Sequence, residues 1–132
     1  MKREIKFKAK RLDGKGWVEG SLIRSTAGIK ERAYIVDNFS SMSDYSVIGV
    51  DPSTVCQFTG LKDSEGKEIW EGDIVHDSYD LLCIDNLYEV VYIEEEGTFA
   101  FKSLDKVDNY EPFVNLLEAY VIGNKFDKEN KV

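Results

Sequence analysis

The strongest constraint on the fold is a two-residue alternation of apolar and charged side chains at residues 4–10, followed by a second basic residue, Arg11. In an extended chain, one face would carry Ile5, Phe7 and Ala9. The opposite face would carry Lys6, Lys8 and Lys10. Glycines at residues 13–16 permit a tight turn, and residues 17–23 have the pattern of a returning strand. The segment therefore predicts a β-hairpin with one buried face.

Short strands separated by turns account for most of the remaining chain. Turns are predicted at residues 51–54 and 59–67, and a loop rich in serine and aspartate at residues 37–45. The clearest hairpin joins residues 87–94 to residues 98–102 through an acidic turn. Further strands are predicted at residues 32–36, 47–50, 55–58, 68–71, 74–76 and 121–124.

One helix is predicted, at residues 112–120. Apolar side chains recur there at helical spacing: Phe113, Leu116, Leu117 and Tyr120. Pro112 suits the first helical position, because a proline lacks the N–H that would be unpaired there.

These elements predict a mainly β fold, a β-dominated α+β domain. We expect a single domain over residues 1–132. Its N-terminal β subregion would cover residues 1–54, and an SH3-like small barrel with the one short helix would cover residues 55–124. Residues 125–132 would form a charged tail.

Composition excludes several classes of protein. The 132 residues are 42% hydrophobic and 32% charged, which is typical of a globular domain. No run reaches the ~20 apolar residues of a membrane helix, and no apolar segment follows the basic N-terminus, so we expect neither a membrane span nor a secretory signal. Cys56 and Cys83 stand apart and His76 is the single histidine. We therefore expect reduced thiols in a cytoplasm, and no metal or cofactor.

The net charge of −8 is unevenly distributed. Residues 1–32 contain ten basic and four acidic side chains, a balance of +6, and residues 33–132 contain seven basic and twenty-one acidic ones, a balance of −14. A strongly acidic body repels DNA, so we do not expect a nucleic-acid partner. The basic segment either packs beside the acidic part of its own chain or docks on that of a second molecule, which would give a homo-oligomer.

An acidic stretch around two glycines is the first candidate site. Its members are Asp63, Glu65, Glu68, Glu71 and Asp73. Hard divalent cations prefer carboxylate oxygens, so a cation site is one hypothesis. The spacing differs from that of a calcium loop, however. We favour the alternative in which Asp63 and Asp73 make local hydrogen bonds in their turns.

The other candidates have ordinary structural interpretations. The glutamates at residues 94–96 form either an acidic docking patch or, as we favour, a solvated hairpin tip. His76 has no serine or cysteine motif beside it, and Gly60 and Gly66 lack the spacing of a phosphate loop. The larger aromatic residues either line a binding surface or pack in the core: Trp17, Trp70, Tyr88 and Tyr92. No catalytic, cofactor-binding or metal-binding residue is assigned.

Four segments resemble the YopX family of phage and prophage proteins. Residues 4–9 (EIKFKA) resemble the family's REIKFRAW, and residues 55–63 (VCQFTGLKD) its VGQYTGLKD. Residues 66–75 (GKEIWEGDIV) resemble its GKEIYEGDIV, and residues 121–126 (VIGNKF) its VIGNIYE. The resemblance implies a small β-rich protein of phage origin in a bacterial cytoplasm, from a family without an assigned activity.

Two functional hypotheses follow. The preferred one is a non-catalytic interaction protein of phage origin that binds host or phage proteins and forms a homo-oligomer. The alternative is a nucleic-acid-associated protein, whose basic N-terminal strands contact DNA or whose acidic body mimics it. Because no catalytic motif is present, we do not expect an enzyme.

Overall fold

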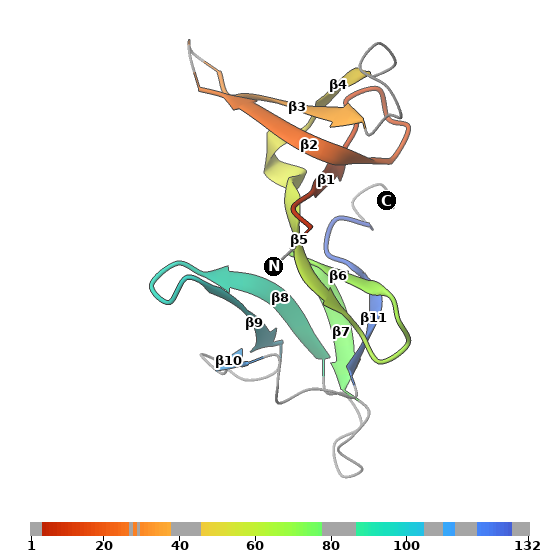
Figure 1. Cartoon of the computed structure of the whole chain (residues 1–132), viewed down its shortest axis with the longest axis vertical. Coiled ribbons are helices and arrows are strands. Elements are labelled where there is room, and N and C mark those ends of the chain that lie inside the picture. Colours follow the sequence, from red (N-terminus) through yellow and green to blue (C-terminus); the bar gives the residue numbers. More distant parts are fainter. Residues whose placement is uncertain are drawn as a thin grey trace. The chain divides into compact units, whose positions relative to one another are not determined.

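The computed structural model describes residues 4–26, 28, 30–37, 46–77, 87–104, 110–112 and 119–127. The chain divides into two compact units, unit 1 at Met1–Phe58 and unit 2 at Thr59–Val132. Strand β5 (Cys56–Lys62) begins in unit 1 and ends in unit 2 (Figure 1). Among the residues described, no helix is long and apolar enough to cross a membrane.

Unit 1 is built on antiparallel strands in the order β4-β3-β2-β1-β5 (Figure 1). Its elements are β1 (Phe7–Lys10), β2 (Trp17–Ser25), β3 (Arg32–Asp37), β4 (Val47–Val50), the 3₁₀ helix η1 (Pro52–Thr54) and the start of β5. The predicted apolar face of the alternating segment is buried only in part: Ala9 is in the core and Phe7 packs against it, whereas Ile5 precedes β1 and is 58% exposed. The buried core consists of Ala9, Ala33, Ile35 and Val50.

Gly20 allows β2 to lie close to β3. It pairs with Phe7 on β1 and with Asp37 on β3. A Cβ atom at this position would lie 2.0 Å from the carbonyl oxygen of Val36 and 3.1 Å from Cγ2 of Ile35. Such contacts are far inside van der Waals distance, so only glycine fits the centre of this sheet.

Unit 2 contains antiparallel strands in the order β10-β9-β8-β7-β11. Its elements are the end of β5, β6 (Glu68–Trp70), β7 (Asp73–Asp77), β8 (Leu87–Ile93), β9 (Thr98–Ser103), β10 (Tyr110–Glu111) and β11 (Ala119–Asn124). The buried core consists of Ile69, Val75, Val90, Phe101, Ala119 and Val121, and Tyr88 packs against it. A register shift in β11 between Val121 and Gly123 leaves Ile122 exposed.

The predicted mainly β fold is confirmed by these antiparallel sheets. Both predicted hairpins are present, one joining β1 to β2 and the other joining β8 to β9. The SH3-like closure of residues 55–124 and the single-domain assignment stay predictions. The predicted loop at 37–45 falls, from residue 38 on, outside the described residues, as do residues 78–86 and the end of the tail from residue 128.

Two element predictions need correction. The predicted helix at residues 112–120 is wrong at its end, because Ala119 and Tyr120 belong to β11. They pair with Asp77 and His76 of β7, and this long-range pairing outweighs the local helical spacing. Residues 113–118 lie outside the described part of the chain. The predicted connection at 59–67 is also too long, because β5 continues to Lys62.

Candidate functional site

Asp63 closes the turn between β5 and β6 and ties that turn to β11. Its Oδ1 accepts hydrogen bonds from the backbone N–H groups of Glu65 at 2.9 Å and Lys67 at 2.8 Å. Its Oδ2 accepts one from the backbone N–H of Val121 at 2.8 Å. Burial alone would raise the pKa of Asp63, but these donors outweigh it and hold the pKa below its ordinary value.

Asp73 makes similar contacts at the start of β7. Its buried carboxylate accepts a hydrogen bond from the backbone N–H of Trp70 at 2.7 Å and another from Nδ2 of Asn124 at 2.9 Å. The predicted local hydrogen bonds of Asp63 and Asp73 are therefore confirmed, and each carboxylate also binds β11. Within the described part of the chain, no three His, Cys, Asp or Glu side chains form a group that could hold a metal ion.

The remaining chemical candidates lie among packed strands and turns. The ring of His76 on β7 packs against Tyr120, with 5.3 Å between ring centroids. Cys56 is buried, and its thiol donates a hydrogen bond to the Thr54 carbonyl at 3.3 Å. Cys83 lies outside the described residues. The glycines of the β5–β6 hairpin, Gly60 and Gly66, adopt positive φ values of 89° and 84°.

The lysines of β1 form a basic face in unit 1. The ammonium groups of Lys8 and Lys10 lie 4.7 Å and 5.1 Å from the ring centroid of Trp17. The side chain of Lys6 is only 14% exposed and lies 3.5 Å from the carboxylate of Glu4. Cation–π contacts and an ion pair therefore engage these charges within unit 1.

A hollow of about 1010 Å³ lies in unit 2, beside the outer half of the β8–β9 hairpin. Its walls come from β5, from both strands of the hairpin and its tip, and from β10. We call this hollow the acidic groove. The residues that characterise it are Leu61, Tyr92, Glu94, Glu95, Glu96, Phe99 and Tyr110.

The apolar surface of the groove continues the core face of the hairpin. Val90 pairs with Phe101 in the core, and the next pair on the same face is Tyr92 with Phe99. The rings of that pair meet edge to face at 5.1 Å between centroids. The side chain of Tyr92 is nevertheless 45% exposed. The hairpin thus carries its apolar face beyond the part that the core covers.

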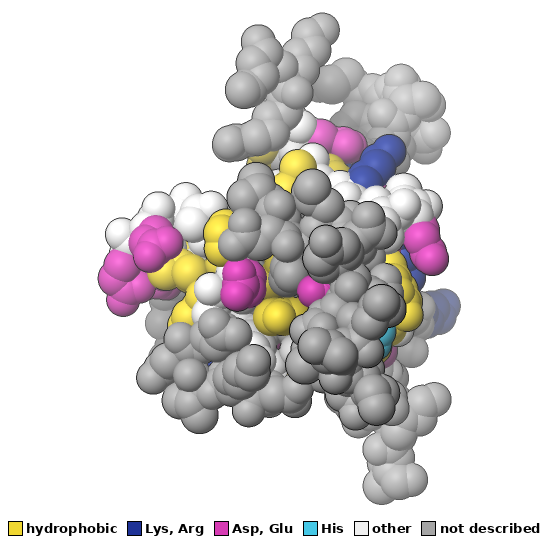
Figure 2. Space-filling view, turned by 90° about the horizontal axis from the view of Figure 1, so that it is seen from below, with side chains coloured by type: hydrophobic (Ala, Val, Ile, Leu, Met, Phe, Trp, Pro, Cys, Tyr) yellow, Lys and Arg dark blue, Asp and Glu magenta, His cyan; other side chains and the backbone are white. Residues whose placement is uncertain are grey.

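Two further apolar side chains and a set of glutamates complete the groove. Leu61 is 48% exposed and Tyr110 is 43% exposed. The lining contains four glutamates, the exposed residues 94–96 and Glu111, and only one basic residue, Lys102. Figure 2 shows acidic side chains beside hydrophobic ones at the left of the view, where the β8–β9 hairpin extends in Figure 1. The groove is therefore both apolar and negative.

The two units carry charges of opposite sign. Unit 1 contains ten basic and seven acidic side chains, which give +3, and unit 2 contains seven basic and eighteen acidic ones, which give −11. The two values sum to the net charge of −8. The acidic groove lies in the negative unit, and the lysines of β1 lie in the positive one.

The model of the YopX protein family matches residues 6–130. The chain belongs to the YopX family. The match spans both units and confirms the resemblance seen in the four sequence segments. A crystal structure of protein EF1440 from Enterococcus faecalis is similar over 98% of each chain, with a TM-score of 0.55 and 23% sequence identity, a likeness that shows a shared fold alone. No curated protein matches the chain.

Sequence reasoning finds only part of the groove in this YopX-family chain. It leaves Tyr92 open between a binding surface and core packing, and for residues 94–96 it favours a solvated tip over a docking patch. In the structure, Tyr92 and residues 94–96 line the groove, whereas Trp70, another aromatic candidate, is buried in unit 2. Leu61 and Tyr110 were missed because their strands meet the hairpin only in the folded chain. Their one sequence signal is an apolar residue near a strand end.

Proposed function

We propose that this YopX-family chain is a non-catalytic interaction protein, derived from a phage or prophage and active in the bacterial cytoplasm, and that a second copy of the chain occupies its acidic groove. The observation that carries the proposal is the exposed apolar floor of Leu61, Tyr92 and Tyr110 beside a rim of glutamates. A contiguous apolar surface with a polar rim is typical of protein–protein interaction sites.

Charge complementarity favours a second copy as the occupant. A ligand of this groove has to be apolar and positive, and unit 1 combines a charge of +3 with exposed apolar side chains. Complementary potentials steer two molecules together and fix their register. A host or phage protein would have to offer the same combination, and is the other outcome of the test.

Sedimentation velocity of the full chain at several salt concentrations tests this proposal. We expect dimers or larger species near 0.01 M salt, where the screening length is about 30 Å, and dissociation toward monomers near 1 M, where it is about 3 Å. Replacing Glu94, Glu95 and Glu96 together by glutamine should weaken association. Glu65→Gln removes an exposed carboxylate outside the groove and should leave association unchanged. A wild-type monomer at every salt concentration would refute self-association and leave the groove to a foreign partner.

A nucleic-acid-associated role is the alternative. It draws on the basic face of β1, where Lys8 and Lys10 lie over Trp17. Against it stand the charge of −8 on the whole chain and the ion pair of Lys6. Titration with duplex and single-stranded DNA at low salt separates the two roles. Binding that is lost when Lys6, Lys8 and Lys10 are neutralised would support contact between these lysines and DNA. No binding at all would exclude DNA contact through β1.

A further inference from the structure

Leu12 is the most exposed large hydrophobic side chain among the residues described, at 71%. It lies in unit 1 at the turn between β1 and β2. Full burial of a leucine stabilises by about 1.5–3 kcal/mol, which a partner that covers Leu12 could gain. A leucine presented to solvent at a turn is therefore a candidate anchor for a partner.

The backbone that carries Leu12 is held on both sides by hydrogen bonds. Its own N–H donates to the Gly49 carbonyl at 3.1 Å. The N–H of Arg11 donates to the Gly16 carbonyl at 2.8 Å, and the N–H of Gly14 donates to the Arg11 carbonyl at 3.2 Å. The exposed leucine is thus presented by an ordered turn, which lowers the entropy that binding has to remove.

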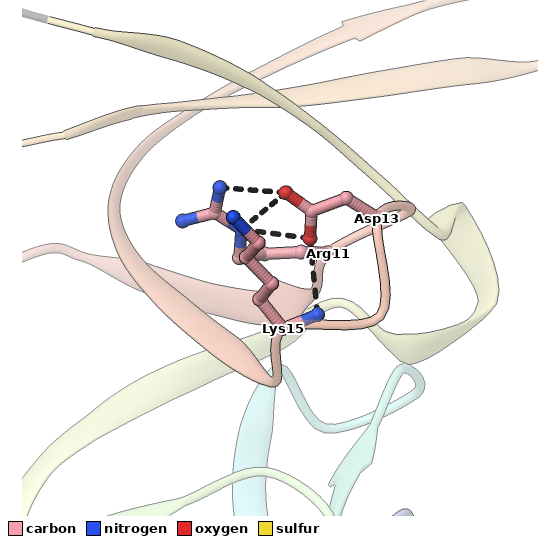
Figure 3. A network of polar contacts seen from close by, with 3 residues as sticks. All are labelled: Arg11, Asp13 and Lys15. Carbon is pink, nitrogen blue, oxygen red and sulfur yellow. Dashed lines mark hydrogen bonds and ion pairs between the residues drawn. The ribbon is translucent and has the colours of Figure 1, made fainter.

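Asp13 orders the same turn through its side chain (Figure 3). The carboxylate accepts hydrogen bonds from Nη2 of Arg11 at 2.7 Å and Nε of Arg11 at 3.1 Å, and from the backbone N–H of Lys15 at 3.0 Å. In this bidentate pair the charges of Arg11 and Asp13 cancel, so the net positive charge of the turn comes from Lys15.

Positive charge and further apolar surface adjoin Leu12. A hollow of about 380 Å³ is lined by Leu12 together with Lys30, Arg32, Tyr34 and Pro52, among others. Its one acidic lining residue, Glu31, is ion-paired with Arg24 at 2.9 Å. We call this the Leu12 surface. It is apolar and positive, whereas the acidic groove of unit 2 is apolar and negative.

We propose that Leu12 of one copy inserts into the acidic groove of a second copy, against Leu61, Tyr92 and Tyr110, while Lys15, Lys30 and Arg32 face the glutamates at residues 94–96. This inference rests on the proposed function and names the element that enters the groove. The two contact surfaces differ, so the interface is heterologous: each copy has one groove and one Leu12 surface. A copy that has lost one surface still keeps the other.

Two variants, each with one surface removed, test the pairing. Leu12→Ser removes the anchor, and Glu94→Lys combined with Glu95→Lys and Glu96→Lys reverses the rim of the groove. Ile122→Ser is the matched control, because Ile122 is 52% exposed and lines neither surface. All replaced side chains are exposed, and circular dichroism of each variant checks that it is folded. The assay is sedimentation velocity at low salt.

We expect Leu12→Ser to weaken self-association by roughly 10- to 100-fold, as the burial of one leucine implies. The rim variant should also be largely monomeric, and Ile122→Ser should match the wild type. An equal mixture of the two defective variants should form a 1:1 dimer, because the intact groove of one can receive the intact Leu12 surface of the other.

The failures are distinguishable. A wild type that is monomeric refutes the proposed self-association itself. A wild type that associates while Leu12→Ser associates equally well refutes only the role of Leu12. A mixture that stays monomeric although both variants are folded refutes the heterologous pairing.

Discussion

Replacing Asp63 by asparagine isolates the bond between the β5–β6 turn and β11. The substitution keeps the size of the side chain and exchanges one carboxylate oxygen for an NH₂ group. One oxygen can still accept from Glu65 and Lys67, but the NH₂ group then faces the N–H of Val121, a donor against a donor. If the amide turns over, the two bonds in the turn are lost instead.

The bond to Val121 determines the magnitude. Val121 is buried, so water replaces the lost acceptor poorly, whereas Glu65 and Lys67 are exposed and can be hydrated. A hydrogen bond to a charged group contributes about 1.5–3 kcal/mol. We therefore expect Asp63→Asn to lower the free energy of unfolding of unit 2 by about 1.5–3 kcal/mol, which would lower the urea midpoint by about 1 M.

Tryptophan fluorescence can report on unit 2 alone. The chain has two tryptophans, and Trp70 is buried in unit 2 while Trp17 lies in unit 1. In a Trp17→Phe background, urea unfolding followed by Trp70 therefore measures the unit that Asp63 stabilises. Glu65→Gln, an exposed change in the same turn, is the control and should stay within about 0.5 kcal/mol of its parent. A loss below that value for Asp63→Asn would refute the argument.

The difference in unfolding free energy between the parent and Asp63→Asn should also depend on pH. Because the pKa of Asp63 is lowered in the folded state, its stabilisation is fully present above the ordinary aspartate pKa of about 3.9. It is lost as the pH falls through the lower, folded-state value. The difference in stability between the parent and Asp63→Asn should therefore be constant above about pH 5 and shrink below about pH 4. A difference that stays constant to lower pH would contradict the assigned hydrogen bonds.

The remaining predictions concern the centres of the two units. Gly20→Ala should destabilise unit 1 by at least about 1–3 kcal/mol, since its Cβ would lie 2.0 Å from the Val36 carbonyl oxygen; thermal melts in a Trp70→Phe background, followed by Trp17, measure this. Gly14→Ala, where no atom lies within 4 Å of the added Cβ, should cost about 1–2 kcal/mol for its positive φ, and a larger loss for Gly14→Ala than for Gly20→Ala would contradict the steric argument. Phe101→Ala should destabilise unit 2 by about 3–5 kcal/mol in urea unfolding, because its ring is fully buried, and a loss below 1 kcal/mol would place it outside the core.

Local patterns were sufficient for most of the strands. The alternation of Ile5, Phe7 and Ala9 with lysines predicted β1, and the paired patterns around the turn at residues 94–97 predicted the β8–β9 hairpin. A strand places successive side chains on opposite faces whatever its partner is, so this information is present in a few consecutive residues. The same reasoning identified Asp63 and Asp73 as residues that form hydrogen bonds in their turns.

Other features depend on residues that are distant in the chain. The apolar spacing before β11 predicted a helix, but pairing with β7 made a strand of Ala119 and Tyr120. Asp63 accepts from Val121, which is 58 positions away, and no local pattern relates the two.

By itself, then, the sequence determined the β class, the two best hairpins, the family and the contrast of charge between the start of the chain and the rest. The tertiary structure alone decided that Leu61, Tyr92 and Tyr110 share one groove with the glutamates of the hairpin tip. The physical reason is that strand formation is governed by the alternation of neighbouring side chains, whereas a groove exists only where separate strands have been brought together by long-range pairing.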